Sequence, residues 1–262
     1  MAGAPSLPVL PAFFEFTADP VWRAIEFVSD LHLARELPST VECWKDYLHN
    51  TGADAVFILG DLFEAWIGDD AREPGSFELA VAEVLSDATT RRTVGFMVGN
   101  RDFLVGAALL RDCGMTALAD PTVLDAWGQR VLLTHGDALC LDDQPYQAFR
   151  TEVRSEAWRR AFLGRPLAQR AQVARGMRDA SDAHKRSQAV WADVDAAAAV
   201  AWMHAAGARD LVHGHTHRPG SELIAPGFTR HVLSDWDCDE PPRRAQVLRL
   251  TRDGFTRIDL VS

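Results

Sequence analysis

The sequence lacks several features that would place it in a specialised class of protein. Its four cysteines (Cys43, Cys113, Cys140 and Cys238) form no C-x-x-C pair, which argues against a disulfide framework and a zinc ribbon. No apolar run approaches the roughly 18 residues that a membrane-spanning helix needs. The first residues also lack the charged start and the apolar core of a secretory signal. We therefore expect a soluble cytoplasmic protein.

Positive charge is also scarce, and it is unevenly distributed. The net charge of −10 disfavours a protein that binds nucleic acid through a general basic surface, so no nucleic-acid partner is expected. Residues 144–190, however, contain ten Lys/Arg residues and only four Asp/Glu residues. The sequence thus combines an acidic body with one basic segment.

Five short apolar runs are each followed by a compact polar cluster. The runs span 24–28, 55–59, 94–98, 131–133 and 211–212, and the clusters read SDLH, GDLFEAWIGDD, GNRD, THGD and HGHTH. Such runs are typical of buried strands, and segments such as 40–50 and 76–88 between them read as helical or mixed. This alternation predicts an α/β sheet with a functional site at the carboxyl ends of its strands. Near the C-terminus, VLRLTRDGFTRIDL predicts two antiparallel strands joined at Asp253-Gly254.

Residues 143–206 interrupt this alternation. The segment is rich in Arg and Ala, and its apolar residues recur four positions apart, as in Phe149/Val153 and Trp158/Phe162. We interpret it as a helical cap inserted into one domain that spans residues 23–262. Residues 1–22 are expected to form a poorly ordered N-terminal extension.

The polar clusters together offer carboxylate, imidazole and amide ligands without thiolates. Their members are Asp30, His32, Asp61, Asn100, Arg101, Asp102, His135, Asp137, His215 and His217. Each fragment alone has an ordinary explanation, such as a helix cap for Asp61 or a turn for Asn100. His135 alone could be a core histidine. All these explanations would have to hold together at successive strand ends, so one shared site for two hard divalent cations is favoured.

The stretch LVHGHTHRPG carries three histidines at alternate positions, His213, His215 and His217. Alternate side chains of an extended chain point the same way, so the spacing alone leaves all three as equal candidates for metal ligands.

The ordered series of these motifs resembles the calcineurin-like metallophosphoesterase superfamily. The resemblance implies an α/β sandwich of two mixed β-sheets flanked by helices, with two metal ions at its edge. One metal would be bound by Asp30, His32, Asp61 and His217, and the other by Asp61, Asn100, His135 and His215. Asp61 would bridge the two ions, and His213 would only support the site.

A finer resemblance concerns the UDP-2,3-diacylglucosamine pyrophosphatases of lipid A biosynthesis. It rests on SDLHL, ILGDLFEAWIGDD, GNRDFLVG, THGDALCLDDQPYQAFR, GMRDAS and HGHTHRP. It implies that a hydroxide activated by two ions, expected to be Mn²⁺, attacks the α-phosphorus and releases UMP and 2,3-diacylglucosamine 1-phosphate. The implied catalytic residues are Asp61, Asn100, Arg101 and His135, and the implied substrate contacts are Asn100, Arg101, Asp143, Ser181, Lys185 and His215. The spacing of SDAHKRSQ leaves His184, Arg186 or Ser187 as alternatives to Lys185.

The basic segment suits a cap that meets an anionic diphosphate on one side and acyl chains on the other. Phe149, Trp158 and Phe162 are hypothesised to line an acyl groove or an edge that faces the membrane. We expect peripheral contact with the cytoplasmic face of the inner membrane and infer no obligate protein partner. The alternatives are another metallophosphoesterase, such as a nucleotide phosphodiesterase or a phosphoprotein phosphatase, and a non-catalytic scaffold of the same fold.

Overall fold

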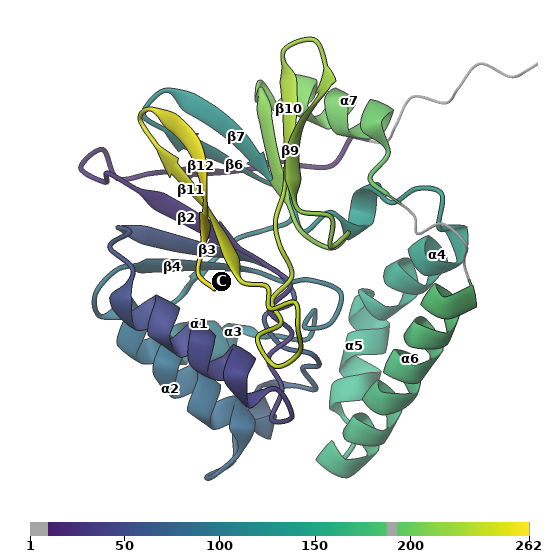
Figure 1. Ribbon diagram of the computed structural model, residues 1–262. Coiled ribbons are helices and arrows are strands. Elements are labelled where there is room, and N and C mark those ends of the chain that lie inside the picture. Colours follow the sequence, from purple (N-terminus) through teal and green to yellow (C-terminus); the bar gives the residue numbers. More distant parts are fainter. Residues whose placement is uncertain (1–9, 188–192, 262) are drawn as a thin grey trace, which may run out of the picture.

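Two six-stranded mixed sheets face each other, and helices cover their outer sides (Figure 1). The computed structural model describes residues 10–187 and 193–261, apart from the side chains of residues 179–187. The predicted fold class, a sandwich of two mixed sheets flanked by helices, is confirmed.

The first sheet has the strand order β12-β11-β2-β3-β4-β5. Its strands are β2 (Ile25–Val28), β3 (Ala55–Leu59), β4 (Thr93–Met97), β5 (Thr116–Ala117), β11 (Gln246–Thr251) and β12 (Gly254–Asp259). Strands β2 to β5 are parallel, and the β11–β12 hairpin joins β2 in antiparallel fashion. Every residue of β3 is buried, so its sequence is continuously apolar instead of alternating.

The second sheet has the order β1-β6-β7-β8-β10-β9. Its strands are β1 (Phe14–Thr17), β6 (Thr122–Ala126), β7 (Gln129–Leu133), β8 (Asp210–His213), β9 (Gly220–Ala225) and β10 (Phe228–Val232). Strands β7 and β8 pair in parallel, although 76 residues separate their ends, because the helical insertion lies between them. This pairing brings the polar clusters after β7 and β8 to the same sheet edge.

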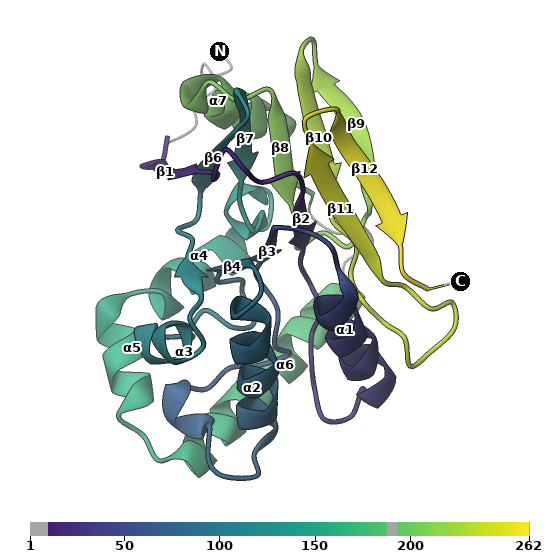
Figure 2. The ribbon, with the colours of Figure 1, turned by 90° about the vertical axis from the view of Figure 1, so that its left-hand side faces the viewer.

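The apolar core forms three layers. Phe27 and Phe57 from the first sheet pack against Leu133 and Val212 from the second. Helices α1 (Pro38–Asn50), α2 (Phe77–Thr89) and α3 (Ala107–Asp112) cover the outer face of the first sheet, and α7 (Ala196–Ala206) covers the second. Figure 2 shows α7 and the α1–α3 group on opposite sides of the sandwich. Burial of this apolar surface is the main stabilising contribution to the fold.

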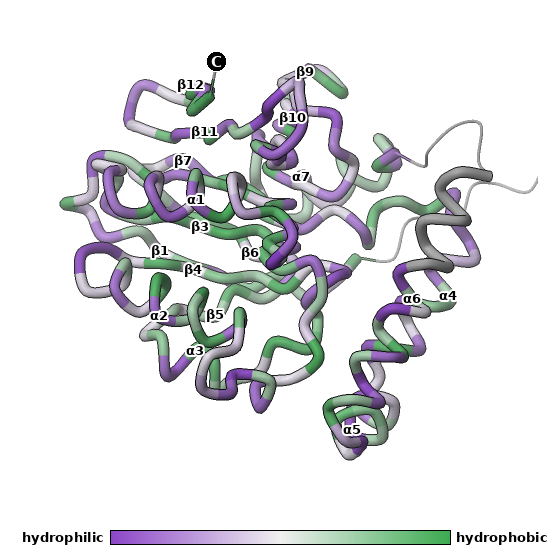
Figure 3. Tube along the Cα trace, turned by 60° about the horizontal axis from the view of Figure 1, so that its bottom comes forward, coloured by the Kyte–Doolittle hydropathy of each residue, from purple (hydrophilic) through white to green (hydrophobic). Residues whose placement is uncertain are grey.

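Helices α4 (Gln144–Val153), α5 (Glu156–Leu163) and α6 (Leu167–Ser187) stand beside the sandwich as a cap (Figure 3). Arg170 of α6 is buried, and it pairs with Asp70 and donates a hydrogen bond to the Ile67 carbonyl at 2.6 Å. Asp70 belongs to the 3₁₀ helix η1 (Asp69–Ala71); a second one, η2 (Asp137–Leu139), precedes the cap. The cap is therefore attached to the body through a buried arginine.

The cap is shorter than the insertion expected over residues 143–206. Helix α7 lies within that range, but Ala198, Trp202 and Met203 are buried against the second sheet, so α7 belongs to the sandwich. The aromatic residues of the cap also differ from the expected groove lining. Phe162 is only 2% exposed and stacks on Trp158 at 4.8 Å, because both belong to the packing between the cap and the body. Phe149, at 39%, is exposed.

The N-terminal extension is more ordered than expected where the structure describes it. Strand β1 pairs in parallel with β6, and Phe16 packs on Trp22 and Phe57. Phe14 of this strand is 54% exposed, so backbone pairing with β6 and the partly buried rings of Phe16 and Trp22 place this segment. Residues 1–9 of the expected extension lie outside the described residues. Across residues 10–187 and 193–261, no helix combines the length and the apolar character needed to cross a bilayer.

Candidate metal centre

Turns after five strands bring the predicted site residues to one place. Asp30 follows β2, Asp61 follows β3, Asn100 follows β4, His135 follows β7 and His215 follows β8. Six of the described non-glycine residues have a positive φ, and five of them lie here: Asp30, His32, Asp61, His215 and His217. Positive φ is uncommon outside glycine, although Asp and His adopt it more readily than most residues, and such conformations gather at functional sites.

Asp30, His32 and His217 form the first half of the site. Nε2 of His217 lies 3.4 Å from Asp30 Oδ1 and 3.4 Å from His32 Nε2. His32 Nε2 in turn lies 4.0 Å from Asp61 Oδ2. Two imidazole nitrogens and two carboxylate oxygens thus converge on one small volume.

Asn100, His135 and His215 form the second half. The Asn100 Oδ1 atom lies 3.0 Å from His135 Nε2 and 2.7 Å from His215 Nδ1. His135 Nε2 is 3.7 Å from Asp61 Oδ1. Because Asp61 directs Oδ2 towards the first half and Oδ1 towards the second, its carboxylate is placed to bridge two cations.

The residues present fit divalent cations. The donor atoms of Asp30, His32 and His217, and those of Asp30, Asp61 and His135, lie within 4.8 Å of one another. Burial disfavours the charged form of His135, but the carboxylates of Asp61, Asp137 and Asp30 outweigh it and raise the pKa to about 9. The carboxylates around His135 therefore favour positive charge at that position, and a bound cation would take the place of the proton on its imidazole.

The backbone is held closely around these side chains. Asp30 accepts hydrogen bonds from the Ser29 hydroxyl at 2.6 Å and from the His215 amide at 2.9 Å. A Cβ on Gly214 would collide with the Asp30 carboxylate and with Ser29. Glycine at position 214 is therefore required by this close approach of the β8 turn to the β2 turn.

His213 is separated from its two neighbours. Its side chain is buried in β8, and Nδ1 lies 2.8 Å from the Gly214 carbonyl oxygen. Burial lowers the pKa of His213 to about 4, so the ring is neutral. His215 and His217 reach the site, whereas His213 lies behind it.

Two acidic residues at the site have roles that the sequence did not indicate. Glu64 Oε2 lies 3.0 Å from His32 Nδ1, and Glu64 also pairs with Arg178 of the cap at 3.1 Å. A carboxylate at the outer nitrogen orients an imidazole and makes it a better ligand. The position of Glu64 within GDLFEAW, directly after β3, is the only sequence signal that could have identified it.

Asp102 binds backbone amides and does not point its carboxylate at the proposed metal ions. Its carboxylate accepts from the amides of Leu62 at 2.8 Å and Gly99 at 2.7 Å. Burial and the charge of Asp61 raise the pKa of Asp102 to about 7. Asp102 therefore links the β3 turn to the β4 turn through their backbone amides.

The expected substrate contacts are only partly described. Arg101 borders the site: its amide donates to Asp61 Oδ1 at 2.8 Å, and its guanidinium lies 3.6 Å from Glu64. Asp143 caps α4 by accepting from the Tyr146 amide at 3.1 Å. The side chains of Ser181 and Lys185, like those of His184, Arg186 and Ser187, lie outside the described residues.

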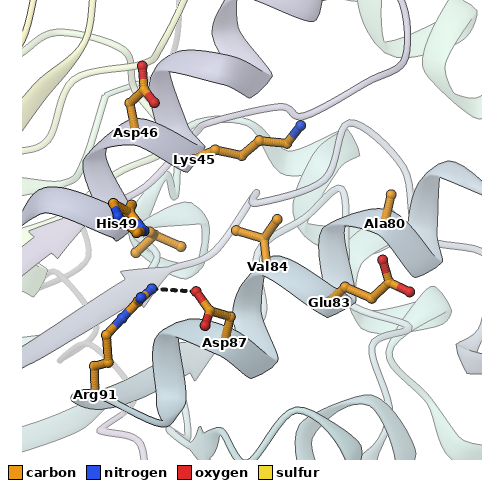
Figure 4. Close-up of a pocket in the computed structure, with 9 residues that line it drawn as sticks. Lys45, Asp46, His49, Ala80, Glu83, Val84, Asp87 and Arg91 are labelled. Carbon is orange, nitrogen blue, oxygen red and sulfur yellow. Dashed lines mark hydrogen bonds and ion pairs between the residues drawn. The ribbon is translucent and has the colours of Figure 1, made fainter.

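A groove on the molecular surface lies away from the metal centre. It lies between α1 and α2 and is lined by Lys45, Asp46, Leu48, His49, Ala80, Glu83, Val84, Asp87 and Arg91 (Figure 4). Arg91 pairs with Asp87 inside it. None of the metal-centre residues lines this groove.

The chain is similar to known proteins over most of its length. A family model described as calcineurin-like phosphoesterase matches residues 25–219. A UDP-2,3-diacylglucosamine hydrolase of Xanthomonas campestris pv. campestris (strain B100) is 46% identical over 243 residues, which are 87% of this chain and 96% of that protein. The protein of that name from Aromatoleum aromaticum is 43% identical over 222 residues, which are 82% of this chain and 90% of that protein. A solved archaeal phosphodiesterase aligns with 90% of this chain and 99% of its own at 12% identity, with a TM-score of 0.44.

Proposed function

This chain belongs to the calcineurin-like phosphoesterase family, and on that basis we propose that it hydrolyses the diphosphate of UDP-2,3-diacylglucosamine. The products are UMP and 2,3-diacylglucosamine 1-phosphate, in a step of lipid A biosynthesis. The observation that carries the proposal is the 46% identity to a hydrolase of that name over 87% of the chain.

The seven strand-end residues are proposed to bind two divalent metal ions. We propose that both ions are Mn²⁺. Asp30, His32, Asp61 and His217 would hold one ion, and Asp61, Asn100, His135 and His215 the other; the distances above support both sets. When bound, such a pair of ions supplies Lewis acidity and lowers the pKa of water.

The protein's own residues orient the substrate. Arg101 is proposed to bind phosphoryl oxygens, because its backbone adjoins the bridging carboxylate of Asp61 and its guanidinium offers a planar group of donors. Asn100 and His215, which already contact each other, would place the same phosphate. Asp143, Ser181 and Lys185 are proposed to contact the rest of the substrate from the cap and its entrance.

The cap is proposed to face the acyl chains and the inner membrane surface. Leu141, Phe149 and Leu163 are exposed apolar residues at or next to its helices, and Arg160 has a side chain that is 78% exposed. Apolar side chains beside an exposed arginine suit an anionic lipid surface. The double variant Arg159→Ala/Arg160→Ala should lower binding to anionic vesicles severalfold, whereas Arg23→Ala, which removes an exposed arginine of the body, should not. Equal binding by all three proteins would refute membrane contact through the cap.

The proposed reaction is tested by product analysis in ¹⁸O water. Hydrolysis at the α-phosphorus puts the label in UMP, whereas attack at the other phosphorus puts it in the sugar phosphate. Asp61→Ala and His135→Ala should each lower turnover by about 1000-fold, which corresponds to several kcal/mol of lost electrostatic stabilisation. His204→Ala, at the exposed end of α7, is the matched control and should keep full activity. Full activity of both site variants would contradict the two-metal mechanism.

A comparison of substrates separates the alternatives. Turnover of UDP-2,3-diacylglucosamine should exceed that of bis-p-nitrophenyl phosphate and of a phosphopeptide at equal Mn²⁺. The opposite order would point to a nucleotide phosphodiesterase or a phosphoprotein phosphatase. A chain that binds metal but turns over none of the three would be a scaffold.

A further inference from the structure

Asp137 is a buried carboxylate that the metal centre itself does not use. It follows His135 and Gly136 at the end of β7, and its side chain is 0% exposed. Its Oδ2 atom accepts hydrogen bonds from the Tyr146 hydroxyl at 2.7 Å, from Arg150 Nε at 2.8 Å and from Arg154 at 3.1 Å. Tyr146 and Arg150 belong to α4, the first helix of the cap, and Arg154 is the residue that ends it.

Two of these donors also reach the second half of the metal centre or the residue next to it. Arg154 donates to the Gly99 carbonyl oxygen at 3.0 Å, directly before Asn100. The Tyr146 ring lies 5.8 Å from the His215 ring, at an interplanar angle of 31°. The groups fixed by Asp137 therefore contact Gly99, the residue before Asn100, and the ring of His215.

The charge of this arrangement favours a rigid connection. The buried Asp137 carboxylate is paired with two positive charges, the guanidinium groups of Arg150 at 2.8 Å and of Arg154 at 3.1 Å. Hydrogen bonds between charged partners are shorter and stronger than neutral ones. A shift of α4 would break several of them at once.

We propose that Asp137 is a positioning residue that ties cap helix α4 to the Asn100–His135–His215 half of the metal centre. The inference rests on the proposed function in so far as those three residues bind a metal ion. One of the two ions should therefore depend on Asp137 for its affinity, and the other should not. The cap thereby takes part in building the metal centre as well as in covering it.

The test is a calorimetric titration of Mn²⁺ into the metal-free full-length protein, which needs no substrate. Asp137→Asn, which keeps the shape and removes the charge, should weaken one of the two binding events by about 10- to 100-fold, as loss of a partner that orients metal ligands does. Asp70→Asn is the matched control: it removes another carboxylate that pairs with a cap arginine but touches no metal-centre residue. Its two affinities should stay within about threefold of those of the parent.

Thermal denaturation of the metal-free variants shows that each is folded. If Asp137→Asn is not folded, Arg154→Met serves instead, since it leaves Asp137 with two donors and removes the contact with Gly99. It should weaken the same binding event severalfold. Parental affinities for both ions in a folded variant would overturn the proposal, and so would equal weakening in Asp70→Asn or a parent that binds no metal. If the metal effect is present but UDP-2,3-diacylglucosamine is not hydrolysed, only the proposed reaction fails.

Discussion

Substitution of Gly99 by alanine should damage the fold and the metal centre together. A Cβ at this position would lie 2.5 Å from the Asp61 amide nitrogen and 2.8 Å from the Asp61 carboxyl carbon. Ordinary van der Waals contacts are 3.4 Å or longer. The β3 and β4 turns would have to separate by roughly 1 Å, because the nearest atoms include backbone that cannot rotate away.

The magnitude depends on the interactions that hold these turns together. Asp102 accepts from the Gly99 amide at 2.7 Å and from the Asp61 amide at 3.3 Å, so separation strains both hydrogen bonds. Overpacking costs about 1 to 3 kcal/mol, and a weakened bond to a buried carboxylate adds about 1 kcal/mol. A total of about 2 to 4 kcal/mol should lower the melting temperature by about 5 to 10 °C in a chain of this size.

Two measurements on Gly99→Ala check this reasoning: urea unfolding followed by tryptophan fluorescence, and Mn²⁺ titration of the folded protein. Affinity should fall because the carboxylate proposed to bridge the ions is displaced. Gly52→Ala is the matched control, since no atom lies within 4 Å of its added Cβ, and it should be neutral or slightly stabilising. If Gly99→Ala unfolds like the parent and binds Mn²⁺ equally well, the tight approach of the two turns is not needed.

Three further predictions concern other parts of the molecule. Burial and the neighbouring Glu26 raise the pKa of Tyr47 well above 10.0, so the stability gained by its neutral phenol is present below pH 10 and is lost above it. The advantage of the parent over Tyr47→Phe in urea unfolding should therefore shrink by about 1 kcal/mol between pH 8 and pH 10.5, and a constant difference would contradict the assignment. Burial raises the pKa of Cys140 to about 12, so mass spectrometry after iodoacetamide treatment at pH 8 should find it alkylated only in the unfolded chain. Arg170→Met should speed proteolytic cleavage of the cap, whereas Arg160→Met, on the exposed face, should not; equal rates would show that Arg170 does not fasten the cap.

The strands could be predicted because each carries its own signal. The run at 55–59 is apolar throughout and is followed at once by Gly60, and the structure places β3 over the same residues. The C-terminal hairpin was predicted from Asp253-Gly254; in the structure its two turn residues are Arg252 and Asp253, and Gly254 is the first residue of β12, paired with Thr251. Helix α7 and strand β1 were assigned differently because their partners lie far away in the sequence. Trp202 is buried by a sheet whose strands include β6 to β8, and β1 pairs with β6 about 100 residues later.

The residue types of the metal centre could also be predicted, because each lies in a short motif directly after a strand. Asp30 and Asp61 follow neighbouring parallel strands, which bring the residues at their carboxyl ends to one edge of a sheet. His135 follows β7 of the other sheet and joins them because the two sheets face each other. The resemblance to a family then divided LVHGHTHRPG into two site histidines and one supporting histidine, and the structure places His213 behind the other two. The position of Glu64 after β3 indicated only that it lies near the site, whereas its pairing with His32 depends on where the turns after β2 and β3 meet.

By itself, the sequence determined which residues end the strands and which chemistry they can perform, since secondary structure and ligand type are properties of short segments. Only the tertiary structure decided which carboxylate faces which group. Asp61 lies between the two halves of the site, Asp102 clamps backbone, and Asp137 holds the cap, although all three are aspartates next to a strand end. The physical reason is that the role of a charged group depends on its burial and on its nearest partners, and both are set by packing between segments distant in the chain.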